Sequence, residues 1–310
     1  MIACYRTEDG HLKETETPEK GGWINMVAPS EGDLLDVVRK CGVDMDMLRA
    51  SLDPEESARI DSENGSFLIL VDLPTIESDG KESIYSTIPL GLIRTADGLI
   101  TVCLRDSHIL RDFSQGRIRD LDTNDSPRFI LQILYRISTR YLQYLRQIDR
   151  KTNTVEAQLQ KNMRNKDLMQ LTRLEKSLVF FATSLKSNEI VLERLMRSDL
   201  IHRDPEDEDT LEDVIVENKQ AIEMCAIQRD ILGSTMNAFS SVISNNLNDS
   251  MKILTSLTLV LSIPTLIASI WGMNVAVPFA SAPWGFWALL GLSALLSTVS
   301  IIILSRHKML

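Results

Sequence analysis

Two long apolar segments near the C-terminal end of the sequence constrain the fold more than any other feature. The first runs from Met251 to Ile270 and the second from Trp284 to Leu304, with a short uncharged link between them. Each has about 20 residues, enough for a helix of ~30 Å, which is the thickness of the hydrocarbon core of a membrane. The sequence therefore predicts a transmembrane helical hairpin with the link at its tip.

The first apolar segment carries a regular polar stripe. Its members recur at alternating spacings of three and four residues, which places them on one face of a helix: Asn248, Met251, Thr255, Thr258, Ser262, Thr265 and Ser269. A single Ser or Thr in such a helix often bonds only to its own backbone, but hydroxyls that face lipid gain nothing. We therefore expect the stripe to face a shared axis, as either a packed seam or a pore.

Charge and composition place the rest of the chain in the cytoplasm. The 310 residues carry a net charge of −10, which argues against binding to nucleic acid. Four scattered cysteines indicate reduced thiols, and no secretory signal is expected at Met1. Basic residues flank the apolar segments, at Lys252 and at Arg306, His307 and Lys308, whereas the link is uncharged. The positive-inside rule then predicts two cytoplasmic ends in a multi-pass protein of the plasma membrane.

The N-terminal part of the sequence is typical of a mixed α/β domain. Strands are expected at Gly22–Val27, Ser66–Leu73, Ser86–Arg94 and Leu99–Leu104, and helices are expected after Ser30 to about Lys40 and at Asp44–Ser51. The sequence has no Gly-rich phosphate loop, no HExxH and no nucleophile elbow, so we do not expect an enzyme.

Long helices follow this domain. Ser126-Pro127 is a typical helix start, and apolar stripes on both sides of Asn162–Asp167 predict an antiparallel helical hairpin. Asp209 or Thr210 is expected to cap the next helix. That helix can continue through the first apolar segment for about 60 residues, with a bend at Pro264 whose freed carbonyl turns toward the polar stripe.

The predicted protein is thus mostly α-helical, and one stripe cannot enclose a pore, so we expect a homo-oligomer built around the first span. Its parts are a cytoplasmic α/β domain (1–125), an antiparallel helical hairpin (126–200), a stalk helix (201–250), a first transmembrane helix (251–271), an external loop (272–283), a second transmembrane helix (284–305) and a basic cytoplasmic tail (306–310).

The residues Trp271-Gly272-Met273-Asn274 end the first apolar segment. A ring of Asn274 amides from several copies would offer neutral oxygens to a cation that keeps its water shell, as Mg²⁺ prefers to do. Alternatively, Gly272 and Asn274 simply cap the end of the helix. The residues alone leave both interpretations open.

A two-helix C-terminal hairpin whose first helix ends in aromatic-Gly-Met-Asn resembles the CorA-type magnesium transporter family. The resemblance continues through Ser244–Asn248 and Met251–Thr255, and more weakly at Trp23–Asn25. It implies a homopentamer that conducts divalent cations, chiefly Mg²⁺ with Co²⁺ or Ni²⁺ as further candidates. Influx would be passive, driven by the membrane potential and gated by cytosolic Mg²⁺.

The same resemblance assigns roles to residues of the first span. Gly272, Met273 and Asn274 match the selectivity filter of the family, in which Asn274 binds the hydrated metal. The positions Asn248, Met251 and Leu254 match pore positions of the family, and Met251 and Leu254 would form a narrow apolar gate.

The resemblance also implies a regulatory Mg²⁺ site between subunits. Asp213, with Glu212 beside it, would pair there with an acid on the neighbouring N-terminal domain. This chain departs from the family at the partner position, because Leu48-Arg49-Ala50 aligns with Leu-Glu-Asp. The partner would have to be Asp53, Glu55 or Glu56, or be missing, and Asp213 could instead only cap a helix.

Other features leave the function less constrained. The external loop lacks the acid that the family often carries beyond Gly-Met-Asn, which leaves the preferred ion open. Arg306, His307 and Lys308 resemble the basic ring at the inner mouth of the family, with interfacial anchoring as the alternative. A zinc transporter of the same superfamily and a membrane-anchored sensor that transports nothing are the competing functions. Met273 argues mildly against zinc, and the polar stripe favours transport.

Overall fold

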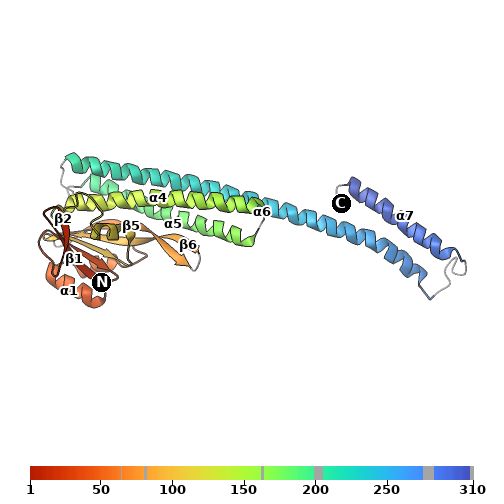
Figure 1. Ribbon diagram of the computed structural model, residues 1–310, viewed down its shortest axis with the longest axis horizontal. Coiled ribbons are helices and arrows are strands. Elements are labelled where there is room, and N and C mark those ends of the chain that lie inside the picture. Colours follow the sequence, from red (N-terminus) through yellow and green to blue (C-terminus); the bar gives the residue numbers. More distant parts are fainter. Residues whose placement is uncertain (64, 80–81, 162–163, 199–204, 275–282, 308–310) are drawn as a thin grey trace. The chain divides into compact units, whose positions relative to one another are not determined.

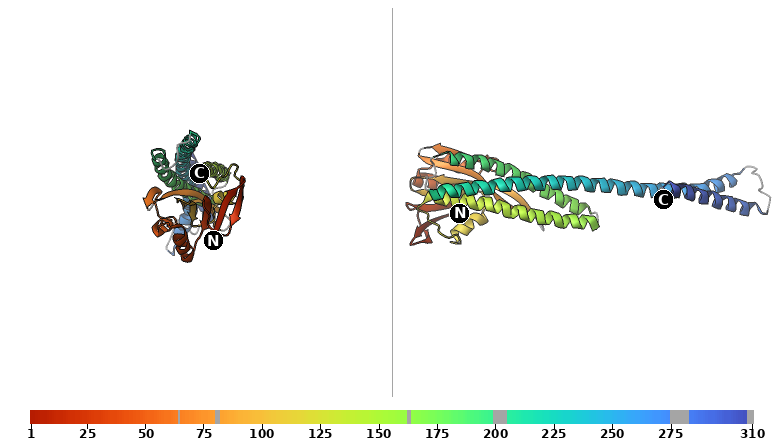
Figure 2. Two further views of the ribbon diagram at one scale, coloured as in Figure 1. Left: turned by 90° about the vertical axis from the view of Figure 1, so that its left-hand side faces the viewer. Right: turned by 90° about the horizontal axis from the view of Figure 1, so that it is seen from above.

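A computed structural model describes residues 1–63, 65–79, 82–161, 164–198, 205–274 and 283–307 (Figures 1 and 2). The chain divides into two compact units, Met1–Gly233 and Ser234–Leu310, which are described separately below. One helix, α6 (Pro205–Trp271), contributes residues to both units.

The first unit is built on one seven-stranded sheet with the order β2-β1-β3-β7-β6-β5-β4. All neighbouring strands are antiparallel except β3 and β7, which run parallel. The strands are β1 (Ile2–Glu8), β2 (His11–Thr15), β3 (Gly22–Val27), β4 (Arg59–Glu63), β5 (Ser66–Asp79), β6 (Glu82–Arg94) and β7 (Gly98–Cys103). The four strands expected from the sequence are confirmed, and β5 and β6 form a longer hairpin than their apolar cores indicated.

Short helices cover one face of this sheet and long helices cover the other. The apolar sides of α1 (Glu31–Cys41) and α2 (Met45–Ala50) pack on Ile24, Met26 and Leu70 in one buried cluster. Ser30 and Asp33 form a capping box at the start of α1, which confirms the expected helix start.

The opposite face carries α4 (Ser126–Lys161) and α5 (Asn165–Met196), which pack against each other and against β5 and β6. Tyr85 of β6 stacks against Tyr144 of α4 and Phe181 of α5. The expected cap of α4 was wrong by one residue. The Asp125 carboxylate accepts the Arg128 amide at 3.2 Å, so Asp125 caps the helix and Ser126 is its first residue.

A buried polar chain crosses the parallel strands. The Trp23 indole donates to the Thr101 hydroxyl at 2.9 Å, which donates to Asn25 Oδ1 at 3.0 Å. All three side chains are buried, and the Trp23 ring packs edge-on against Phe129 of α4. Because these polar atoms satisfy each other, β3 can bury Trp and Asn on the same face.

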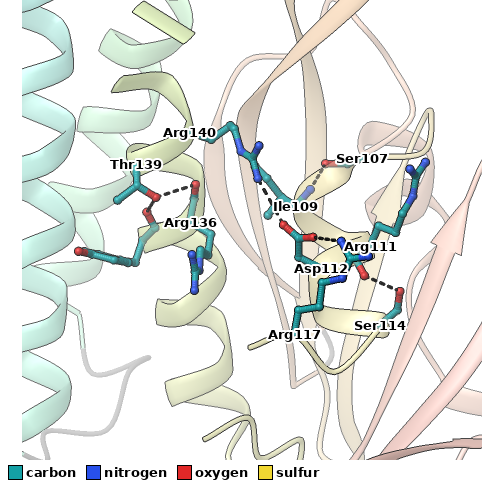
Figure 3. Close-up of polar contacts among 10 residues, drawn as sticks. Ser107, Ile109, Arg111, Asp112, Ser114, Arg117, Arg136, Thr139 and Arg140 are labelled. Atoms are coloured by element: carbon teal, nitrogen blue, oxygen red, sulfur yellow. Dashed lines mark hydrogen bonds and ion pairs between the residues drawn. The ribbon is translucent and has the colours of Figure 1, made fainter. Parts of the chain in front are cut away.

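A third element of this unit, α3 (His108–Ser114), is tied to α4 by ion pairs rather than by a large apolar face. Asp112 accepts hydrogen bonds from Arg117 at 3.1 Å and from Arg140 at 3.3 Å (Figure 3). The arginines around α3 therefore fix the helix in place, and the sequence patterns did not predict this element.

Helix α6 begins earlier than expected, at Pro205, a favourable first-turn residue. Thr210 lies inside the helix, where its hydroxyl donates to the Glu206 carbonyl at 2.7 Å, so it is not the cap. In the first unit, α6 docks through buried residues such as Asn218 and Cys225, which bond to carbonyls of α5.

The second unit contains the rest of α6 and α7 (Gly285–Arg306). Both helices are long and apolar enough to cross a membrane, and almost none of either apolar stretch is buried within the chain. Pro264 lies inside α6, which remains a helix through it. This agrees with the expected pair of membrane spans.

Candidate functional site

One face of α6 in the second unit packs toward α7. Pro264, Ile267, Ala268 and Trp271 line a groove of about 360 Å³ together with residues of α7: Phe286, Leu289, Leu290 and Ser293. Pro264 is on this face, so the carbonyl one turn before it, which has no amide donor from Pro264, lies on the same side. The expectation that the freed carbonyl turns toward the polar stripe is therefore wrong.

The polar stripe occupies the other side of α6. A shallow apolar-and-hydroxyl groove is lined there by Thr258, Leu261, Ser262, Thr265, Leu266, Ser269 and Ile270. At 100° per residue, the centre of the stripe lies about 150° around the helix from the face that packs on α7. All seven stripe residues predicted from the sequence are exposed in the single chain, and so is Leu254 at the edge of the stripe. Within one chain the stripe thus has no partner helix among the described residues.

The hydroxyl protons of the stripe are already used inside the helix. Thr258 donates to Leu254 O at 2.8 Å, Ser262 to Leu259 O at 2.8 Å and Thr265 to Leu261 O at 2.9 Å. A hydroxyl has one proton and two lone pairs, so these side chains offer acceptors to whatever faces them. The back-bonding considered for single residues is present, and it leaves a row of neutral oxygens.

The Gly-Met-Asn segment follows the last turn of α6. The Gly272 amide donates to Ala268 O at 2.9 Å, and a Cβ at this position would lie 3.2 Å from the same oxygen, which favours glycine. Neither Gly272 nor Asn274 has the positive φ of a left-handed helix cap. Met273 and Asn274 are exposed. Residues 275–282 of the expected external loop lie outside the described part of the chain.

The acids of the expected regulatory site are spread over the first unit. Glu212 and Asp213 are exposed on α6, well inside the helix, so Asp213 is not a helix cap. The Asp53 carboxylate accepts the Glu55 amide at 3.0 Å, and Glu56 is ion-paired with Arg59. Among the residues that the structure describes, no group of three metal-ligating side chains comes together in one chain.

The alternative partner position also lacks an acid in space. Ala50 ends α2, and the Arg49 guanidinium lies 3.3 Å from Glu31. At the other end of the chain, Arg306 is the last residue of α7 and His307 follows it, both exposed. Lys308 lies outside the described residues.

The cysteines agree with thiols that carry no chemistry. All four are free, and three of them are buried. Burial raises the pKa of Cys103 and of Cys225 to about 11 and also raises the pKa of Cys4 and Cys41. Such groups stay protonated at neutral pH.

Comparison with known proteins identifies the arrangement. The family model described as CorA-like Mg²⁺ transporter protein matches residues 19–306. The chain is 28% identical over 294 residues to the cobalt/magnesium transport protein CorA of Methanocaldococcus jannaschii, covering 92% of this chain and 90% of that protein.

Solved structures give the same picture. The complete structure of the CorA magnesium transporter from Methanocaldococcus jannaschii has a TM-score of 0.80 at 25% identity and covers 98% of this chain and 96% of that one. The cytoplasmic domain of ZntB from Vibrio parahaemolyticus has a TM-score of 0.59 at 11% identity, covering 79% of this chain and 97% of that one, a likeness of fold alone.

Proposed function

The chain belongs to the family of CorA-like Mg²⁺ transporters, and from this premise we propose that it conducts Mg²⁺ inward through a pore formed by several copies of α6. Membership makes it a divalent-cation transporter of the CorA superfamily and not an enzyme. The observation that carries the proposal is the exposed stripe of neutral oxygens on α6, which faces away from α7.

The proposed filter is the segment Gly272-Met273-Asn274 at the external end of that stripe. Mg²⁺ gives up its water ligands reluctantly, so a ring of Asn274 amides would hold the hydrated ion without a fixed charge. Gly272 allows the close backbone approach to Ala268 that ends the helix. The stripe then lines the conduit down to Met251 and Asn248, with Leu254 at the apolar gate.

The proposed driving force is the membrane potential. No carboxylate lies on the stripe between Asn248 and Ser269, so the pore itself contributes no strong binding. A divalent ion that moves inward gains ~4.6 kcal/mol per 100 mV, twice the value for one charge. This suffices for passive uptake across the plasma membrane, with both ends of the chain in the cytoplasm. We take the oligomer to be a homopentamer, as the resemblance implies.

Regulation is proposed to use the same ion. Exposed Asp213 and Glu212 of one copy would face Asp53 of the next, and Mg²⁺ would bridge carboxylates that otherwise repel each other. High cytosolic Mg²⁺ would then hold the subunits in a closed state. Asp213→Ala should remove the protection from proteolysis that Mg²⁺ gives, and unchanged protection would exclude Asp213 from the site.

The deciding experiment is cation flux through purified protein in liposomes. Wild type should take up Mg²⁺ faster at an inside-negative potential than at zero potential, and Asn274→Ala should lose most of this flux. Thr298→Ala is the matched control, because its hydroxyl also bonds to its own helix but lies on α7. Equal flux at both potentials would contradict passive, potential-driven uptake.

The same assay separates the competing functions. Running it with Mg²⁺, Co²⁺, Ni²⁺ and Zn²⁺ ranks the ions, and the name of the cobalt/magnesium relative supports Co²⁺ as a second substrate. Zinc flux coupled to a pH gradient would indicate the zinc transporter. Absence of any flux, with Asn274→Ala indistinguishable from wild type, would indicate the non-transporting sensor.

A further inference from the structure

Asp72 of β5 occupies an unusual place at the contact between the sheet and the long helices. Strand β4 pairs with β5 only as far as Leu70, so the edge of β5 has no strand partner at Asp72. Asn188 of α5 takes the place of that partner. Its side chain accepts the Asp72 amide at 2.8 Å and donates to the Asp72 carbonyl at 2.8 Å, and Tyr141 of α4 donates to the same carbonyl at 3.1 Å.

The Asp72 carboxyl faces the same helices. The Ser184 hydroxyl of α5 lies within hydrogen-bonding reach of this carboxyl and also donates to Thr87 of β6 at 2.9 Å. Ser184 and Asn188 are both almost fully buried. One hydroxyl proton is therefore shared between two acceptors, the Thr87 hydroxyl oxygen and the Asp72 carboxylate.

The surroundings of the carboxyl contain no charge that compensates for burial. Burial raises the pKa of Asp72, and the bond from Ser184 opposes this effect. Of the neighbouring groups, Tyr141 has a pKa well above its ordinary value, also because of burial, and the pKa of Cys225 of α6, which faces Tyr141, is about 11. Both stay neutral below pH 8. Within the described residues, no Lys, Arg or His is ion-paired with Asp72.

We propose that Asp72 is a proton-controlled clasp that holds α5 against β5 and β6. When the carboxyl is protonated, it can donate a hydrogen bond itself, and the Ser184 proton is released to Thr87, so every polar atom of the contact is satisfied. When the carboxyl is ionised, it draws the Ser184 proton away from Thr87 and leaves a charge at the contact between helix and sheet. Acid therefore tightens this contact and alkali loosens it. The clasp is independent of how ions cross the membrane.

The direction of the pH effect follows from linkage. A carboxyl with a raised pKa binds more protons in the docked state than in the undocked state, so docking is favoured as the pH falls through the docked-state pKa toward the ordinary value near 3.8. Within that window the docking equilibrium changes by up to about tenfold per pH unit.

Amide hydrogen exchange on the full-length protein tests the clasp. Exchange of the β5 and α5 amides should be compared in wild type, Asp72→Asn and Asp149→Asn at several values between pH 5 and pH 8. Asn mimics the neutral carboxyl, so the ratio of wild-type to Asp72→Asn exchange rates should rise with pH. Asp149 is an exposed acid of α4, and the corresponding ratio for its variant should stay constant. A constant ratio for Asp72→Asn would overturn the proposal.

Ser184→Ala provides a second, independent variant. It keeps the titrating carboxyl but removes the hydroxyl that stabilises the charged form. Its exchange rates should therefore rise with pH more steeply than those of wild type in this region. A pH profile identical to that of wild type would equally overturn the clasp.

Discussion

Replacing Asn188 by Leu tests whether one side-chain amide completes the edge of β5. Leu has nearly the shape of Asn but no hydrogen-bonding group, and position 188 is 3% exposed. The substitution removes both 2.8 Å bonds to Asp72. The Asp72 carbonyl keeps the bond from Tyr141, but its amide loses the partner that the structure provides.

The expected loss follows from that difference. A buried donor without a partner costs about 1–3 kcal/mol, and a unit of this size loses about 2–4 °C in Tm per kcal/mol, so Tm should fall by about 2–12 °C. Thermal unfolding of the detergent-solubilised chain, followed by circular dichroism, measures the shift.

Asn153→Leu is the matched control for this change. Asn153 is an exposed α4 residue with one long bond of 3.4 Å, and its replacement should leave Tm unchanged. If Asn188→Leu unfolds at the same temperature as Asn153→Leu, the amide does not serve as a strand partner.

Other positions give sharp expectations as well. A Cβ on Gly91 would lie 2.5 Å from Ser51 Cβ, so Gly91→Ala should lower stability by about 1–3 kcal/mol, and adding Ser51→Gly should restore part of it in the same melting assay. Cys225 has a pKa of about 11, so at pH 8 its thiolate is about 100-fold scarcer than that of a thiol of pKa 9, and maleimide labelling of native protein should be slow and accelerate as pH rises. Thr258→Leu on the stripe should reduce Mg²⁺ flux, whereas Thr298→Leu on α7 should not; equal effects would remove the distinction between the two faces.

The elements that the sequence predicted are those whose pattern reflects burial. Gly22–Val27 and Leu99–Leu104 are continuous apolar runs because β3 and β7 are central parallel strands that are buried on both faces. Edge strands lack this signal. Strand β4 reads Arg-Ile-Asp-Ser-Glu, with alternating charges typical of an edge that avoids further pairing, and a polar run of this kind looks like a loop.

Helix starts were harder to predict, because several residues near each start can act as a cap. Asp125 and Ser126 are both good caps, and which one is used depends on how the chain approaches α4 from β7 and α3. The beginning of α6 was placed late because Pro205 was treated as part of an acidic linker. Its position in the first turn, followed by three acids that suit a helix N-terminus, is a signal that could have been used.

The parts of the site that need two copies lie beyond one sequence. The stripe on α6 was predicted because helical periodicity alone defines it. The partner of Asp213 was not, because Asp53, Glu55 and Glu56 lie in a loop whose carboxylates already bond within their own chain, to a backbone amide and to Arg59. Periodicity says nothing of which acid a second copy would present.

The hydrogen bonds of the stripe favour a wet pore over a dry seam, the two alternatives that the sequence left open. Thr258, Ser262 and Thr265 each donate their only hydroxyl proton to their own helix, so they face the axis as acceptors. Identical stripes from other copies would also present acceptors, and lipid tails offer no donors, so neither could satisfy these oxygens. Water can, because each molecule donates two hydrogen bonds, and the water shell of a cation turns its hydrogens outward. A stripe of this kind is therefore matched to the surface of a hydrated ion.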